Sequence, residues 1–178
     1  ATGAITALAF WQETLVVFRE TAIYALPGDG FGNVAGDGQN IGPAREISLD
    51  VGAVNQESVA TTERGVVFHS SKGKWLLTKG WQLEHIGSNV VDYDSEAPLA
   101  VHVGEFEHEI RWLTSSRMIV LNTLAGQWGE WSIAGGLHAC MWNGAHVYLT
   151  AAGPKQQLST YTALTYGMDV ETAWIKLA

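Results

Sequence analysis

The stretch "ESVATTERGVVFHSSKGKWLLTKGWQLEHIG", residues 57–87, consists of short apolar segments separated by polar turns. The segments span residues 57–62, 65–70, 74–79 and 83–87. They are rich in β-branched and aromatic residues, whereas the turns between them supply Gly, Ser, Lys and other polar residues. Runs of this length between turn residues are typical of strands joined by hairpins. The stretch therefore predicts one four-stranded antiparallel sheet.

The same succession of segments is found three more times along the chain. The first segments of the other copies are "ITALAF" (5–10), "LAVHVG" (99–104) and "LHACMW" (137–142). The second segments are 15–20, 109–114 and 146–151, and the third are 22–26, 117–122 and, least clearly, 157–162. The fourth segments are 45–50, 128–132 and 172–177. In the last copy, Asn143-Gly144 gives the strongest hairpin signal in the chain.

Four strands per unit, in units of about 40–45 residues, are typical of the blades of a β-propeller. We therefore predict an all-β, propeller-like single domain with four blades, at roughly 1–52, 53–92, 93–135 and 136–178. Closed four-bladed rings lie at the low end of propeller sizes. Two alternatives therefore stay open: the chain is part of a larger propeller, or it completes a ring by association.

The pair Trp128 and Trp131, in the segment "QWGEWS" (127–132), has two interpretations. A spacing of three is odd, so a regular strand would direct the two rings to opposite faces of its sheet. Each ring could then pack against an adjacent blade, with Gly129 permitting a bulge. Packing is the favoured interpretation, and the alternative is that the rings form an exposed platform for sugars.

The composition excludes several function classes. The formal net charge is −8, from 10 basic and 18 acidic residues, which disfavours nucleic-acid binding. No apolar run approaches the roughly 18–20 residues that a membrane helix needs. The single cysteine, Cys140, rules out an internal disulfide and any multi-cysteine metal cluster. Its apolar neighbours predict a small buried hydrophobe instead of a catalytic thiol.

A glycine-rich loop, "PGDGFGNVAGDGQNIGP" (27–43), is the most distinctive local feature. Its oxygen-bearing side chains match neither the EF-hand spacing nor the calcium-binding nonapeptide repeat, so we predict no metal and no cofactor. A long loop on a rigid scaffold often carries contacts. We therefore predict a contact or ligand surface that combines this loop with the tryptophan pair: Asp29, Phe31, Asn33, Asp37, Trp128 and Trp131.

The stretch "HVGEFEHEIRW" (102–112) is the strongest candidate for acid–base or zinc chemistry. Read as a strand, it has Glu105, Glu107, Glu109 and Arg111 on one face and His108 on the other. Because zinc needs converging ligands, the stretch predicts a solvated acidic face. Nucleophile motifs are absent, and Lys72 stands where a sialidase-type motif has Asp. We therefore predict that the protein is not an enzyme.

Residues 46–87 resemble the propeller proteins of tailed bacteriophage virions. The resemblance rests on an Asp-x-Gly turn followed by Glu-Ser-Val, Gly-Val-Val-Phe, Ser-x-Lys-Gly and a terminal Ile-Gly. It extends to "LVVFRETAIYAL" (15–26) and "ETAWIKL" (171–177), so it touches most of the chain. Its motifs are turns and blade strands, with no catalytic residue among them.

The resemblance implies a structural role in a virion tail, neck or baseplate, after synthesis in the host cytoplasm. The expected partners are other virion proteins or further copies of the chain, with one face toward the host surface. A tryptophan-rich lectin that binds cell-surface glycan is the alternative, followed by a glycan hydrolase with two converging carboxylates.

Overall fold

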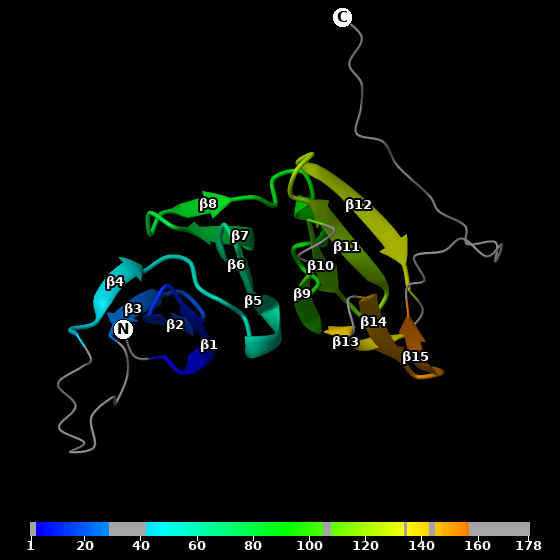
Figure 1. Ribbon diagram of the computed structural model, residues 1–178, viewed down its shortest axis with the longest axis horizontal. Helices are drawn as coiled ribbons and strands as arrows, with labels where there is room; N and C mark the ends of the chain where they lie inside the picture. Colours follow the sequence, from blue (N-terminus) through cyan, green and yellow to red (C-terminus); the bar gives the residue numbers. More distant parts are fainter. Residues whose placement is uncertain (1–2, 29–41, 105–107, 134, 143–144, 157–178) are drawn as a thin grey trace, which may run out of the picture. The chain divides into compact units, whose positions relative to one another are not determined.

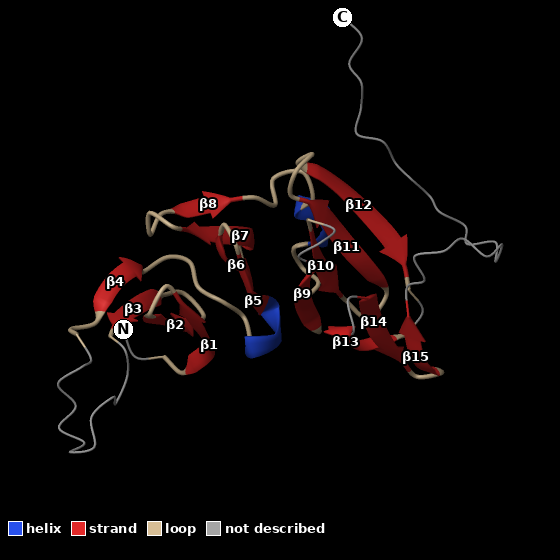
Figure 2. Cartoon of the chain, in the orientation of Figure 1, coloured by secondary structure: helices blue, strands red, loops and turns tan. Residues whose placement is uncertain are grey.

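The computed structural model describes residues 3–28, 42–104, 108–133, 135–142 and 145–156 (Figure 1). The chain divides into two compact units, Ala1–Pro98 and Leu99–Ala178. Strands account for almost all regular structure in the described ranges, as the colouring of Figure 2 shows. The helical elements among these residues are two single 3-10 turns, η1 (Gln56–Ser58) and η2 (Val91–Tyr93). Neither is long or apolar enough to cross a membrane.

The first unit contains two antiparallel four-stranded sheets, each with its strands in chain order. The first sheet comprises β1 (Ile5–Trp11), β2 (Thr14–Arg19), β3 (Ile23–Pro27) and β4 (Arg45–Ser48). The second sheet comprises β5 (Val59–Thr62), β6 (Gly65–Ser70), β7 (Gly73–Thr78) and β8 (Leu83–His85). The strand order and the strand positions that the repeat predicts are confirmed here.

The second unit contains a third and a fourth sheet, also antiparallel. The third sheet comprises β9 (Ala100–Gly104), β10 (Glu109–Leu113), β11 (Arg117–Asn122) and β12 (Gln127–Ser132). The fourth sheet comprises β13 (Gly136–Trp142), β14 (Ala145–Thr150) and β15 (Gly153–Gln156). Its predicted last strand, 172–177, lies outside the described residues.

One strand differs in position from the sequence prediction. The third strand of the fourth sheet begins at Gly153, not at residue 157. Thr150 pairs directly with Gly153, so only two residues form the turn before β15. Pro154 argues against a strand in the sequence, but proline is tolerated where its missing N–H faces away from the neighbouring strand.

The core of the first unit lies between its two sheets. One face of β1–β3 packs against one face of β6 and β7, in a cluster of buried residues that includes Val16, Phe18, Phe68 and Leu77. The rings of Phe18 and Phe68 come from different sheets, and their centroids are 5.1 Å apart. Such aromatic pairs stabilise packing beyond the area that they bury. The two sheets are therefore held face to face by their side chains.

The core of the second unit repeats this arrangement with smaller residues. Ala100, Leu113 and Met118 of the third sheet pack with Ala139 of the fourth sheet. Tyr148 of β14 and Trp131 of β12 lie at the edge of the cluster, half-buried. A fourth sheet that has three described strands is therefore still anchored by a buried apolar face.

Replacement by alanine should affect stability very differently at two glycines. A Cβ on Gly65 would lie 1.9 Å from the backbone oxygen of Leu77, at a φ of +151°. A Cβ on Gly129 would meet nothing within 4 Å. Gly65→Ala should therefore lower the free energy of unfolding by more than about 2 kcal/mol. Gly129→Ala should change it by less than about 1 kcal/mol. Urea titration measures both, and equal losses would contradict the strand register.

Candidate functional site

The predicted contact surface divides into a part that the structure describes and a part that it does not. Asp29, Phe31, Asn33 and Asp37 lie outside the described residues. The base of their loop is described: Gly42 donates its N–H to the oxygen of Pro27, at 2.7 Å. The loop therefore starts and ends at one point, the junction between β3 and β4.

Trp128 and Trp131 are both in β12 and have opposite orientations, as their spacing predicts. Trp128 pairs with Leu121 and Trp131 pairs with Met118, in a register without a shift. The bulge that we allowed at Gly129 is therefore absent, because the strand stays regular across it. Trp128 contacts Trp112 of its own sheet, with ring centroids 5.3 Å apart. Any role of the pair in binding a ligand stays a prediction.

Trp131 belongs to a polar cluster between the third and fourth sheets. The Arg111 guanidinium lies over the Trp131 ring, 4.5 Å from its centroid. The same guanidinium donates from Nε to Glu109 Oε2 at 3.0 Å. Arg111 is only 1% exposed, whereas Glu109 is 23% exposed. The predicted solvated face is therefore wrong for Arg111, which the fourth sheet helps to bury, whereas Glu109 stays partly exposed.

Two histidines complete the cluster. His102 of β9 and His146 of β14 are both buried, and their Nε2 and Nδ1 atoms are 2.8 Å apart. Burial, followed by the neighbouring His146 and Arg111, lowers the pKa of His102 from 6.5 to about 3. Burial and Arg111 lower the pKa of His146 to about 4. Both rings are therefore neutral at pH 7, and one ring donates to the other.

The buried rings of this cluster fit a role in packing between the sheets better than a role in proton transfer. An effective general base has a pKa near the working pH. The pKa values of these two rings, about 3 and about 4, are far below neutral pH. No group of three or more His, Cys, Asp or Glu side chains in the described ranges could hold a metal ion. The sequence could not predict the pair, because its members are 44 residues apart and meet only when the sheets stack.

A second buried ionic group lies in the second sheet. Lys74 of β7 is 1% exposed, and its Nζ is 2.8 Å from Asp94 Oδ1. Asp94 follows η2 and is 16% exposed. His69 pairs with Lys74 across β6 and β7, and burial together with the Lys74 charge lowers its pKa to about 4. The segment after β8 is therefore fastened to the sheet by a charge pair.

Replacing Asp94 should lower the free energy of unfolding more than replacing Lys74. Asp94→Ala leaves the ammonium of Lys74 buried without a counter-ion, which should cost about 3 kcal/mol or more of unfolding free energy. Lys74→Met keeps the apolar stem and leaves only the partly exposed Asp94, so it should cost about 1 kcal/mol. Chemical denaturation of both variants tests the prediction, and equal losses would show that the ammonium has access to water.

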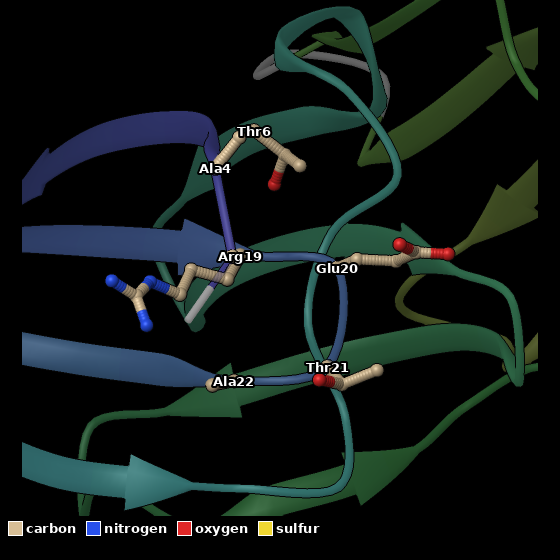
Figure 3. Close-up of a pocket in the computed structure, with 7 residues that line it drawn as sticks. Ala4, Thr6, Arg19, Glu20, Thr21 and Ala22 are labelled. Atoms are coloured by element: carbon tan, nitrogen blue, oxygen red, sulfur yellow. The ribbon is translucent and has the colours of Figure 1, made fainter. Parts of the chain in front are cut away.

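One small depression is formed by described residues of the first unit. It has a volume of about 260 Å³ and lies beside the turn between β2 and β3 (Figure 3). Arg19, Glu20, Thr21 and Ala22 line it from the turn, together with Gly3, Ala4 and Thr6. The side chains of Arg19 and Glu20 extend in opposite directions, so they do not converge on one point. Small-molecule sites usually measure about 300–1,000 Å³ and hold converging polar groups.

Cys140 differs from its prediction. The thiol is exposed, although its apolar neighbours predicted burial. Ala139 faces the third sheet, so Cys140 and Trp142 point to the opposite side of the fourth sheet. Trp142 is accordingly 72% exposed. The prediction of burial was wrong because, within this unit, the third sheet covers only the opposite face of the strand.

Comparisons with known proteins concern the fold alone. No protein-family model matches the chain, and no curated protein does. Among solved structures, a chain of a nidogen/laminin complex is similar, with a TM-score of 0.53 and 11% identity over 78% of this chain and 51% of that one. The Neurospora crassa Pan2 WD40 domain gives 0.53 and 14%, over 83% of this chain and 44% of that one.

PorZ, a bacterial surface component of the type-IX secretion system of Porphyromonas gingivalis, gives a TM-score of 0.53 and 11% identity. That match covers 94% of this chain and 22% of PorZ. The chain thus spans about half or less of the length of the chains that it resembles. Together with the four antiparallel sheets, the likeness shows an all-β fold of the β-propeller type.

Proposed function

We propose that the chain is a non-enzymatic propeller scaffold that binds other proteins. The observation that carries the proposal is the exposed apolar surface of β1. Ile5, Leu8 and Phe10 are 60%, 46% and 64% exposed on one strand. Contiguous apolar side chains in water are a feature of interaction surfaces. A nidogen/laminin complex among the similar structures shows a propeller-type chain in a complex with another protein.

The narrower proposal is that this scaffold belongs to a phage virion, in the tail, neck or baseplate. Its support is the resemblance of residues 46–87 and 15–26 to virion propeller proteins. The acidic net charge of −8 is compatible with protein partners, because they need complementary charges only in local patches. The neighbouring virion proteins would then bind the surface loops of the scaffold, including the 27–43 loop.

Purified particles provide the test. Cross-linking and quantitative mass spectrometry of density-purified virions should find the chain in a fixed copy number, linked to other virion proteins. Finding it only in the lysate, and never in particles, would overturn the virion role and leave the scaffold role to be tested separately. Glycan-array binding by the wild-type chain that is lost in a Trp131→Ala variant of unchanged stability would replace the scaffold with the lectin alternative.

A further inference from the structure

Each sheet has two faces, and the packing within each unit follows one rule. The face that carries Phe18 and Ile23 in the first sheet packs against the second sheet. The face that carries Leu113 and Met118 in the third sheet packs against the fourth. Both pairs occupy the same place: they flank the turn between the second and third strands of their sheet. We call this the leading face, and the opposite one the trailing face.

The rule identifies two largely apolar faces that no other sheet of their own unit covers. The trailing face of the first sheet carries Leu8 and Phe10, which are exposed, and Leu15, Val17, Tyr24 and Leu26, which are half-buried. Two charged residues, Arg19 and Glu46, lie on the same face. The leading face of the fourth sheet carries Cys140, Trp142, Val147, Leu149 and Pro154, together with the exposed His138. Trp142 and Leu149 are 72% and 42% exposed. Apolar faces of this kind bind other proteins or cause aggregation.

We infer that these two faces bind each other between two copies of the chain. The trailing face of one copy packs against the leading face of the other, and the same contact forms reciprocally. In both units, a leading face is followed by a trailing face, so the new contact repeats an interface that the chain already uses. The inference rests on the proposed scaffold function and names a second copy as the partner.

The area of the faces favours a reciprocal pair of contacts. Three or four strands about 4.8 Å apart, each five residues long, give on the order of 300 Å² of flat area per face. A single contact of that size is well below the roughly 800 Å² per partner of a stable complex. Two contacts formed at once approach that value, and they leave neither apolar face in water. Association through unlike faces closes when the rotation allows it.

The test uses opposite charges on the two faces. Phe10→Lys and Trp142→Glu each place a charge on an exposed position, so neither should disturb the fold. The wild-type chain should sediment at twice its 19.2 kDa, and each variant alone should sediment as a monomer, with association weakened by at least about 30-fold. An equimolar mixture of the two variants should recover the dimer, because one contact is intact and the other pairs opposite charges.

The control is Leu124→Lys, at a position that is 74% exposed in the turn after β11 and belongs to neither face. It should sediment as the wild type does. The reactivity of the Cys140 thiol gives a second readout, since dimerisation covers it: reaction with a thiol reagent should be slower in the wild type than in Phe10→Lys. A monomeric wild type, a dimeric Trp142→Glu variant, or a mixture that stays monomeric would overturn the inference. Because this experiment uses the purified chain, its result does not depend on whether virions contain the protein.

Discussion

Between pH 7.5 and pH 5 the free energy of unfolding should fall by about 6 kcal/mol, from roughly 2 kcal/mol for each of three buried histidines. Burial holds the pKa of His69 and His146 at about 4 and that of His102 at about 3. In the unfolded chain, each has its ordinary value of 6.5. Below pH 6.5, the unfolded chain therefore binds protons that the folded chain does not.

The sign follows directly from this difference. Above pH 6.5 both states are neutral at these histidines, so they add no pH dependence. As the pH falls from 6.5 toward 4, each contributes a loss of about 1.4 kcal/mol per pH unit. The loss levels off only when the folded-state pKa is reached. Guanidinium titrations at several pH values measure it.

His69→Asn isolates one contribution, because the amide can form hydrogen bonds but cannot take up a proton. Between pH 7.5 and pH 5, this variant should lose about 2 kcal/mol less than the wild type does. Parallel stability curves for the two proteins would show that His69 is hydrated in the folded state. His69 would then not be the buried ring that the structure describes.

Phe68→Ala should lower the free energy of unfolding by about 4 kcal/mol. Phe68 is fully buried between the first and second sheets, so truncation removes its apolar contacts and leaves a cavity. Because its ring contacts Phe18, the double variant should show a coupling of about 1 kcal/mol in a double-mutant cycle. Urea denaturation at neutral pH measures both quantities.

Leu124→Ala is the control for the loss of a large apolar side chain, since this residue is mostly exposed. It should change stability by less than about 0.5 kcal/mol. If Phe68→Ala were equally mild, the two sheets of the first unit would not be packed through this face. Additive losses in the double variant would show that the Phe18 and Phe68 rings do not interact.

The strands could be predicted from the sequence because their signals are local. Segments such as 65–70 and 117–122 are apolar and bounded by turn residues, and β6 and β11 have those same limits. Alternation along the strand was also enough to place Trp128 and Trp131 on opposite faces of β12. Local signals fail at Pro154, where a tight turn and a proline-containing strand look like loop.

The polar clusters could not be predicted, because they depend on which sheet faces which. His102 and His146 are distant in sequence, and Arg111 looked like part of an acidic, hydrated strand. Burial of Lys74 depends on Asp94, which lies after the second sheet in a stretch without strand signals. The prediction that Cys140 is buried was wrong for the reverse reason, since an apolar strand does not reveal whether one of its faces stays uncovered. The predicted contact loop at 27–43 stays a prediction.

The central claim is that the two antiparallel sheets within each unit pack face to face. The most direct measurement is a nuclear Overhauser experiment on the chain with labelled phenylalanine rings. The structure predicts cross-peaks between the ring protons of Phe18 and Phe68, which lie on different sheets with centroids 5.1 Å apart. Assigned spectra in which each ring shows cross-peaks only to residues of its own sheet would contradict the account.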